Sequence, residues 1–409
     1  MLLNRARLSA VLAAEGVDAV VLTTPANLVY GADYGSEFLL GRFEDHTAAV
    51  VLAADPAGPA VLVVPEFDLP HLCESPSWVP ELRSYGNPWS SVGAFMGATL
   101  EARLDSALRV RLKEMRARLA ATQLPDFFAA LSDAIRGAGL GAKRLAADDP
   151  RVGKRLEAAG LGAGPIADAL WPMRRARLVK TPAERAIMTH GAEINRFALG
   201  RVIEAGRPGM RESDLTRTYR RALVEHDARH LGERGMMFGT GDASSFSLPA
   251  GDDRTLTPGD AIVLDCLGTW RGYHMDLART GVVGAPSAAQ KLRFAAVKAA
   301  LEEVEATRMR PGIHTAEVRT LTREVVARFG LRPELVSVTT HAVGLEVFEF
   351  PYPDSLAQGF ALEEGMIVNT EVFYRDPELG SFHLEDSVVI EGAGCRMLAP
   401  MPRELVVFA

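Results

Sequence analysis

The sequence predicts an α/β domain followed by a larger α+β domain, and three observations support this prediction. The first third of the chain alternates helical periods with short β-rich runs, a rhythm typical of an α/β domain. The C-terminal half repeats one order of elements twice, two helices followed by strands. Hydrophobic residues make up 48% of the chain and charged residues 24%, the balance of a globular protein that can bury a large core.

The bulk properties narrow the classes of function. Two domains are expected, because the chain has 409 residues and a domain typically has roughly 150. A formal charge of −7 argues against a basic face that would bind nucleic acid. Three scattered cysteines, Cys73, Cys266 and Cys395, predict a reducing compartment, with the cytoplasm as the default. No apolar run approaches the roughly 20 residues of a membrane span.

The N-terminal domain is expected to occupy residues 1–175. Leu8, Leu12 and Val17 recur at helical spacing, so the first segment predicts an amphipathic helix rather than a signal peptide. Runs rich in β-branched residues predict strands, and an Ala- and Arg-rich stretch predicts helices before a crossing into the second domain. The strands are expected at 19–24, 48–54 and 60–65, the helices at 99–160, and the second domain at 176–409.

The C-terminal domain is expected to contain two copies of one unit. Thr181 and Glu184 have the spacing of a capping box in the first copy, and Ser287 and Gln290 repeat that spacing in the second. Each box predicts the start of a helix, and each helix precedes a second helix and then strands. The other expected elements are a helix from Ser213, a helix that Thr315 caps and that runs to Gly330, and strands near 261–283, 337–348 and 366–391.

Four acidic residues lie in these predicted strands, two in each copy. Asp265 ends the apolar run AIVLD, and Asp276 follows across an expected β-hairpin. Glu371 and Glu385 lie in the alternating segments MIVNTEVFY and SFHLEDSVVI, again separated by a turn. Carboxylates on adjacent strands can face one cavity, and buried acids are costly unless they are protonated or bind cations. The pattern therefore predicts a metal site.

His341 completes the predicted ligand set. Oxygen ligands with a single imidazole suit Mn, Co, Fe or Zn better than a thiolate-type site would, and paired ions about 3.5 to 4 Å apart commonly activate water. Cys266 adjoins Asp265 in the sequence but is expected to point to the opposite face of the strand, so it is not counted as a ligand. The expected cofactor is a pair of divalent ions, Mn, Co or Zn.

These segments resemble the family of prolidases, aminopeptidases P, methionine aminopeptidases and creatinases, which has the pita-bread fold. Four segments carry the resemblance: LTPGDAIVLDCLGTWRGYHMDLART, THAVGLEVFEFPY, EEGMIVNTEVFY and HLEDSVVI. More weakly, RLSAVLAAEGVDAVVLTTPANLVY is similar to a creatinase-type N-terminal domain. The resemblance implies a creatinase-type α/β domain at 1–175, a pita-bread metal-binding catalytic domain at 176–409, and a homodimer.

The resemblance also implies a role for each ligand. Asp276 and Glu385 would be shared by two metal ions that are bridged by a hydroxide. Asp265 would bind one ion, and His341 and Glu371 the other. Glu371 would also be the catalytic base that takes the proton from the incoming water. Such ions lower the pKa of water, polarise the scissile carbonyl and stabilise the developing oxyanion.

The sequence departs from the family's peptidases at two positions beside the expected metals. Those peptidases read GLEVHEAPY after the metal histidine, whereas Phe348 replaces the second histidine here. Those peptidases carry a further histidine about seventeen residues before the first metal aspartate. Leu248 occupies that position here, or Ala250 if there is a small gap, and no histidine occurs between His230 and His274. An apolar side chain cannot donate a hydrogen bond, and the loss of a donor to the transition state commonly costs about 10²- to 10³-fold in rate.

Two other histidines lie close to the predicted ligands. His274 is two residues before Asp276, and His383 is two residues before Glu385, where the family's peptidases usually have arginine. Strand alternation places each histidine on the face of its acid. Either imidazole could replace a proton shuttle or a substrate anchor, with a plain hydrogen-bonding or surface role as the alternative. The substrate pocket is therefore expected to include Leu248, Phe348, His274 and His383.

The expected function is the hydrolysis of a small peptide or amide, by resemblance to Xaa-Pro dipeptidases and aminopeptidases. The alternative is a non-peptidase hydrolase or lyase that acts on a small nitrogenous or sulfonium compound, as creatinase, ectoine hydrolase and dimethylsulfoniopropionate lyase do. The two missing histidines strengthen that alternative, but the peptidase remains the first expectation. A non-catalytic binding module is the third possibility, but such modules usually lose their metal ligands, and here all five predicted ligands are retained.

Overall fold

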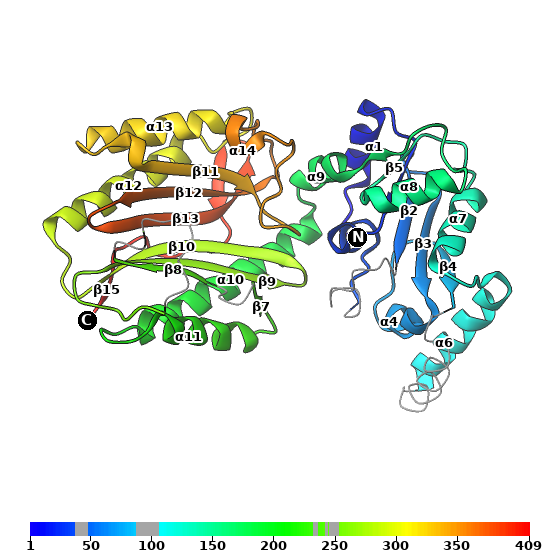
Figure 1. Cartoon of the computed structure of the whole chain (residues 1–409), viewed down its shortest axis with the longest axis horizontal. Coiled ribbons are helices and arrows are strands. Elements are labelled where there is room, and N and C mark those ends of the chain that lie inside the picture. Colours follow the sequence, from blue (N-terminus) through cyan, green and yellow to red (C-terminus); the bar gives the residue numbers. More distant parts are fainter. Residues whose placement is uncertain (37–47, 87–105, 232–235, 242–243, 245–252) are drawn as a thin grey trace. The chain divides into compact units, whose positions relative to one another are not determined.

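The computed structural model describes residues 1–36, 48–86, 106–231, 236–241, 244 and 253–409. The contacts between residues divide the chain into two compact units, Met1–Arg177 and Leu178–Ala409. Each unit has a sheet of its own (Figure 1). Leu248, which the sequence places in the substrate pocket, lies outside the described residues. Among the described helices, none combines the length and the apolar character that a membrane span requires.

The N-terminal unit contains a mixed six-stranded sheet with the strand order β4-β3-β2-β1-β5-β6. Strand β1 pairs antiparallel with β2 and parallel with β5. Every residue of β1, β2 and β3 is buried, as expected for strands that are covered on both faces. The strands are β1 (Ala19–Leu22), β2 (Ala49–Ala53), β3 (Ala60–Pro65), β4 (Glu81–Tyr85), β5 (Leu145–Ala147) and β6 (Ala167–Asp168).

Two helices of this unit begin at aspartate caps. The side chains of Asp126 and Asp149 accept hydrogen bonds from the backbone N–H groups of Ala129 and Arg151, which satisfies donors that the helix itself leaves open. The stretch in which the sequence predicts a crossing between domains contains helix α9. The helices are α1 (Arg5–Ala14), α2 (Pro25–Ala32), η1 (Glu66–Asp68), α4 (Leu69–Glu74), α6 (Ser106–Leu119), η2 (Ala120–Thr122), α7 (Phe127–Gly137), α8 (Pro150–Ala158) and α9 (Leu170–Leu178).

The C-terminal unit is built on a nine-stranded sheet, in which six strands have the order β11-β12-β13-β10-β9-β7. Strand β14 pairs with β13, β15 with β10, and β8 with β9. The predicted hairpin between the two aspartates is present: Arg271 and Gly272 at its turn have φ angles of 49° and 81°, as in a type I′ turn. The strands are β7 (Arg229–His230), β8 (Met236–Thr240), β9 (Ala261–Trp270), β10 (Tyr273–Val283), β11 (Val336–Ala342), β12 (Ile367–Asp376), β13 (Gly380–Glu391), β14 (Gly394–Met397) and β15 (Val406–Phe408).

Two helix pairs pack on this sheet, one from each predicted copy. In Figure 1, α12 and α13 lie beside β11, β12 and β13, whereas α10 lies beside β9 and β10, and α11 packs against α10, β7 and β8. Both predicted capping boxes are formed, at Thr181 and Ser287. Two helix starts differ from the prediction by one residue. Helix α11 begins at Glu212 rather than at Ser213, and His314 rather than Thr315 caps α13. The helices are α10 (Pro182–Ala205), α11 (Glu212–Val224), α12 (Ala288–Thr307), α13 (Thr315–Arg328), η4 (Pro333–Leu335) and α14 (Ser355–Gln358).

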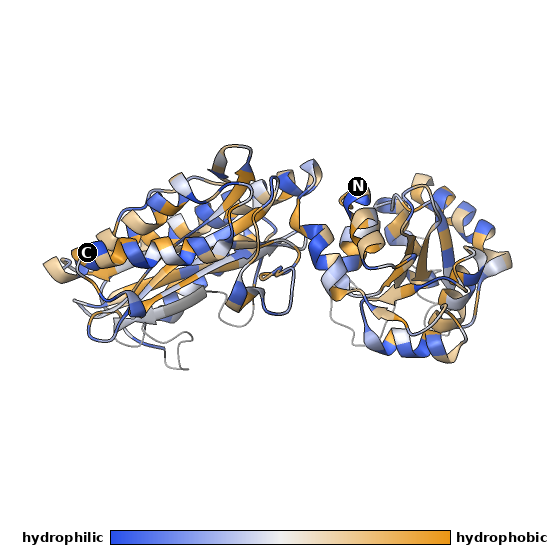
Figure 2. Ribbon diagram, turned by 90° about the horizontal axis from the view of Figure 1, so that it is seen from above, coloured by the Kyte–Doolittle hydropathy of each residue, from blue (hydrophilic) through white to orange (hydrophobic). Residues whose placement is uncertain are grey.

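Side-chain alternation gives the sheet an apolar face and a polar face. Leu264 and Cys266 of β9 belong to the core that includes α10 and α11, and Leu384 of β13 belongs to the core that includes α12 and α13. Figure 2 shows that the strands are largely hydrophobic, while the helices carry hydrophilic residues as well. Neighbours in a strand point to opposite faces, so Asp265 and Glu385 share the face that is turned away from both helix pairs.

The capping box of α10 contains a buried acid with an unusual affinity for protons. Glu184 accepts hydrogen bonds from the backbone N–H of Thr181 at 2.8 Å and from the hydroxyl of Tyr273 at 3.1 Å. Burial raises the pKa of Glu184 from 4.5 to about 7, although Lys180 nearby acts in the opposite direction. The folded state therefore binds this proton more tightly than the unfolded state does.

We expect Glu184→Gln to flatten the pH dependence of stability. Because the folded-state pKa is raised, the contribution of Glu184 is fully present below about pH 4.5 and is lost as the pH rises to about 7. Because a glutamine stays neutral, the variant should avoid the loss of about 3 kcal/mol in the free energy of unfolding that the wild type undergoes as the pH rises. Urea unfolding of both proteins at pH 5 and pH 8 would measure the difference. Parallel pH profiles for the two proteins would contradict the expectation.

Candidate metal centre

Strand register places three of the four predicted acids in one row across the sheet, and Asp276 lies on β10 two residues away from that row. Glu371 of β12 lies directly opposite Glu385 of β13, and Ala278 of β10 pairs with both Glu385 and Asp265. Adjacent strands are about 4.8 Å apart, so the row places Asp265 and Glu385 two strands apart with an alanine between them. Because Ala278 ends at its Cβ atom, it places no further side-chain atoms between the two carboxylates.

A first group of possible metal ligands contains Asp276, His341 and Glu385. The Nε2 atom of His341 lies 3.8 Å from Oδ2 of Asp276 and 3.5 Å from Oε1 of Glu385. The Nδ1 atom of His341 lies 3.0 Å from the carbonyl oxygen of Val347. Because a carbonyl only accepts hydrogen bonds, Nδ1 carries the proton, and Nε2 presents its lone pair to the two acids.

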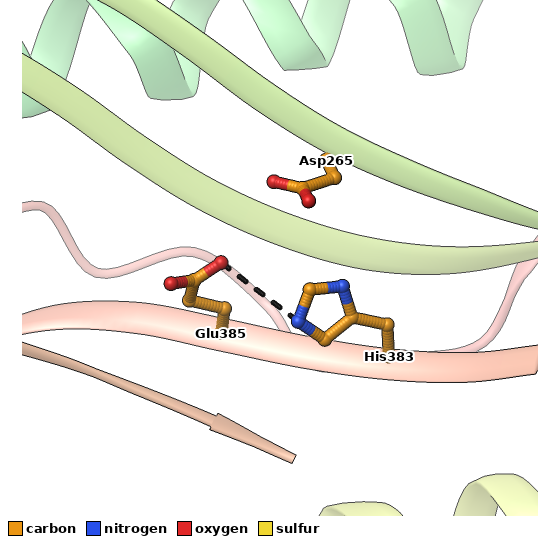
Figure 3. Close-up of side chains that lie close together, drawn as sticks. All are labelled: Asp265, His383 and Glu385. Atoms are coloured by element: carbon orange, nitrogen blue, oxygen red, sulfur yellow. Dashed lines mark ion pairs between the residues drawn. The ribbon is translucent and has the colours of Figure 1, made fainter. Parts of the chain in front are cut away.

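A second group contains Asp265, His383 and Glu385, whose ligand atoms all lie within 4.8 Å of one another (Figure 3). The Nε2 atom of His383 lies 3.8 Å from Oε2 of Glu385 and 3.1 Å from Oε2 of Glu371. Glu371 belongs to neither group and is connected to the cluster through His383. Glu385 belongs to both groups, with one carboxylate oxygen turned toward each histidine.

The residues fit divalent cations, because two carboxylate oxygens are buried without a hydrogen bond. Oδ1 of Asp265 and Oδ1 of Asp276 have no hydrogen-bond partner within the described residues, and the two residues are only 4% and 7% exposed. A buried, unpaired carboxylate oxygen is costly. Oxygen donors together with imidazole nitrogens are the ligands that Mn, Co and Zn accept.

The protein without metal ions would hold extra protons at this centre. Burial and the neighbouring Glu385 raise the pKa of Asp265 to about 8, and the same causes raise the pKa of Asp276. Burial opposes the charged form of His341, but the contact with Glu385 outweighs it and raises the pKa. Burial also opposes the charged form of Glu371, but the contact with His383 outweighs it and lowers the pKa. Bound cations favour the ionised carboxylates.

A layer of supporting residues holds Glu385 in place. Asn369, which is fully buried, donates a hydrogen bond from Nδ2 to Oε1 of Glu385 at 2.9 Å. The guanidinium of Arg279 donates to the backbone oxygen of Glu385 at 3.0 Å and to Asp386 at 2.9 Å. Asn369 was not predicted from the sequence, although its place two residues before Glu371 in an alternating strand puts it on the same face.

The residues predicted to line the substrate pocket have different surroundings. Phe348 is 49% exposed, and its ring centroid lies 4.5 Å from that of His341. His274 is partly buried, with Nδ1 3.1 Å from the carbonyl oxygen of Gly344. His383 is fully buried beside the acids. Cys266 lies in the core that includes α10 and α11, on the opposite face from Asp265 as predicted.

Comparison with known proteins identifies the family. The model of metallopeptidase family M24 matches residues 186–392, just over half of the chain. The chain belongs to metallopeptidase family M24. The matched segment contains all five predicted ligands and His383, and the family's proteins bind two divalent metal ions. The resemblance to prolidases, aminopeptidases P and creatinases is therefore confirmed.

Curated relatives of this M24 protein include the Xaa-Pro dipeptidase of Pyrococcus furiosus, which is 31% identical over 235 residues, 56% of this chain and 65% of the relative. The chain thus matches less than two thirds of the length of that relative. The Xaa-Pro dipeptidase of Pyrococcus horikoshii is 30% identical over 239 residues, 57% of this chain and 66% of the relative. Both relatives are named as peptidases, which does not favour the predicted alternative of a non-peptidase enzyme.

Solved structures show that the M24 protein has the predicted fold. The Xaa-Pro dipeptidase of Bacillus anthracis superposes with a TM-score of 0.75 at 18% identity and covers 98% of this chain and 98% of its own. The prolidase of Pyrococcus horikoshii OT3 has a TM-score of 0.71 at 19% identity and covers 98% and 99%. The pita-bread fold predicted for the C-terminal domain is therefore confirmed.

Proposed function

We propose that this protein is a dinuclear metal-dependent peptidase that hydrolyses Xaa-Pro dipeptides. One observation carries the proposal: two ligand groups, each with an imidazole, share the carboxylate of Glu385. Paired ions on a shared carboxylate are typical of two-metal hydrolases. The names of the P. furiosus and B. anthracis proteins supply the substrate class.

The five residues predicted as ligands are proposed to hold the two ions. Asp276 and Glu385 would be shared by both ions, Asp265 would bind one of them, and His341 and Glu371 the other. When bound, the ions would lower the pKa of water and polarise the substrate carbonyl. Mn, Co and Zn are the candidates, because each accepts carboxylate and imidazole ligands.

Glu371 is proposed to accept the proton of the attacking water. Contact with His383 keeps the pKa of its carboxyl below the ordinary value, so the group is ionised at neutral pH and can act as a base. Its side chain is 22% exposed, whereas that of Glu385 is 3% exposed. Glu371 therefore presents the more accessible carboxylate to a substrate.

Phe348 is proposed to form an apolar wall of the substrate pocket. Its ring stacks on that of Phe350 with centroids 5.9 Å apart and an interplanar angle of 8°. A flat, exposed aromatic surface beside His341 can bury a proline ring. His274 and Leu248 are proposed to lie around the same pocket. The protein is further proposed to be a cytoplasmic homodimer.

We expect the protein loaded with Mn(II), Co(II) or Zn(II) to release proline from Ala-Pro and Leu-Pro, as measured by chromatography of the products. The matched variant Glu371→Gln should lower kcat by about 10²- to 10⁴-fold, because it removes the base while keeping the shape of the side chain. No release of proline with any of the three metals, from protein that holds two ions, would contradict the substrate class.

A further inference from the structure

His383 lies inside the acid cluster without a satisfactory hydrogen bond. Its side chain is fully buried, and among the described residues neither Nδ1 nor Nε2 has a hydrogen-bond partner. Nε2 is instead turned toward carboxylates, 3.1 Å from Glu371 and 3.8 Å from Glu385. Burying an imidazole costs free energy unless its nitrogens have binding partners. This geometry therefore indicates that His383 binds a partner other than a protein side chain.

We propose that His383 is a direct ligand, through Nε2, of the metal ion that Asp265 and Glu385 hold. Each of the two ions would then have one imidazole, His341 for the first and His383 for the second. This inference rests on the proposed two-metal function and adds a ligand to it. The five predicted ligands include one histidine, so the proposal changes the composition of the centre.

The distances support shared coordination. Two atoms that are each about 2.1 Å from one ion lie about 3 to 4 Å apart, depending on the angle at the metal. The separation of 3.8 Å between His383 and Glu385 is too long for a hydrogen bond and falls within that span. The corresponding separation between His341 and Glu385 is 3.5 Å, so the two histidines flank the shared carboxylate in a similar way.

The fold holds the His383 ring in this position. The hydroxyl of Thr280 accepts a hydrogen bond from the backbone N–H of His383 at 2.7 Å and donates one to its carbonyl oxygen at 2.8 Å. The ring of Phe373 lies beside the imidazole, with centroids 4.4 Å apart and an interplanar angle of 32°. A ligand that is fixed before the ion binds loses little conformational entropy on binding.

A second imidazole has a consequence for metal choice. Imidazole suits Zn, Fe, Ni and Cu, whereas carboxylate and water suit Mg, Ca and Mn. The ion beside Asp265 should therefore be exchanged for Zn(II) or Co(II) more readily than a site made of carboxylates alone would allow. Replacing His383 should lower the affinity for Zn(II) more than the affinity for Mn(II).

The decisive measurement is the number of imidazoles per ion in the wild-type protein loaded with two Co(II) or Zn(II) ions. X-ray absorption should show one imidazole nitrogen per ion on average. In His383→Phe, which keeps a ring against Phe373, and in His383→Arg, which places a cation beside Glu371, the average should fall to one half. The affinity for one ion should fall by more than about 10²-fold, beyond the 10- to 100-fold effect of losing a merely supporting group.

His274→Phe is the matched control, because His274 has the same spacing from Asp276 but contacts a backbone carbonyl. It should leave the imidazole count unchanged. An average of one half in the wild-type protein, or His383→Arg with two tightly bound ions and an unchanged count, would overturn the proposal. Wild-type protein that binds no ions would instead overturn the proposed function, so the two failures can be distinguished.

Discussion

Glu385→Gln is expected to abolish the binding of both metal ions and to lower hydrolysis of an Xaa-Pro dipeptide by about 10⁴-fold. The reason is that Glu385 belongs to both ligand groups, with Oε1 toward His341 and Oε2 toward His383. A glutamine keeps the shape and can still accept the hydrogen bond from Asn369, but it carries no charge to balance two cations.

The same variant should separate metal binding from folding. Without metal, it should be at least as stable as the wild type, because one buried acid has been removed from a cluster of acids. At a free ion concentration of about 1,000 times the Kd, the free energy of unfolding should rise by about 4 kcal/mol for the wild type and hardly at all for the variant. Thermal unfolding with and without Mn(II) would measure both effects. Glu391→Gln, at the exposed end of the same strand, is the control, and equal metal-induced gains in both variants would refute the shared role of Glu385.

Lys180→Met is expected to destabilise the protein by about 3 to 5 kcal/mol. Lys180 Nζ lies 2.6 Å from Oε2 of Glu349, and both side chains are completely buried. Removing the cation takes away the opposite charge that offsets much of the desolvation cost of the buried Glu349 carboxylate. Glu349 also accepts a hydrogen bond from the backbone N–H of Leu345 at 3.1 Å, so we expect the segment that contains Phe348 to be disturbed as well.

Two further variants test the cause of this loss. Lys180→Met combined with Glu349→Leu should recover much of the stability, because both charges are then absent. Lys298→Met removes the same type of cation from an ion pair with Glu404 at 2.8 Å, in which the side chains are 29% and 79% exposed, and should cost less than about 1 kcal/mol. Urea unfolding measures the change in the free energy of unfolding for each variant. A similar loss of stability for Lys180→Met and Lys298→Met would contradict the role of burial.

The arrangement of the strand residues could be predicted because side chains alternate along a strand. That rule placed Asp265 and Glu385 on one face and Cys266 on the other, as the structure has them. The order of the helices and strands followed from capping boxes and turns, which are local signals. The roles of the five residues as metal ligands stay predictions, which the Glu385 variant tests.

Other features could not be predicted, because they depend on distances through space. Alternation gives the face of His383 but not how far its ring reaches toward Glu371 and Glu385. Lys180 and Glu349 are 169 residues apart in the chain, and no periodicity relates them. The cap of α13 was misplaced by one residue because His314 and Thr315 are adjacent polar residues and either could begin a helix.

The sharing of ligands between the two copies decides whether one copy could bind an ion alone. The first copy supplies Asp265 and Asp276, and the second supplies His341, His383 and Glu385, yet each ligand group combines residues of both. A single copy therefore has no complete group. An isolated copy would need a second chain to bind an ion, so joining both copies in one chain makes ion binding independent of protein concentration.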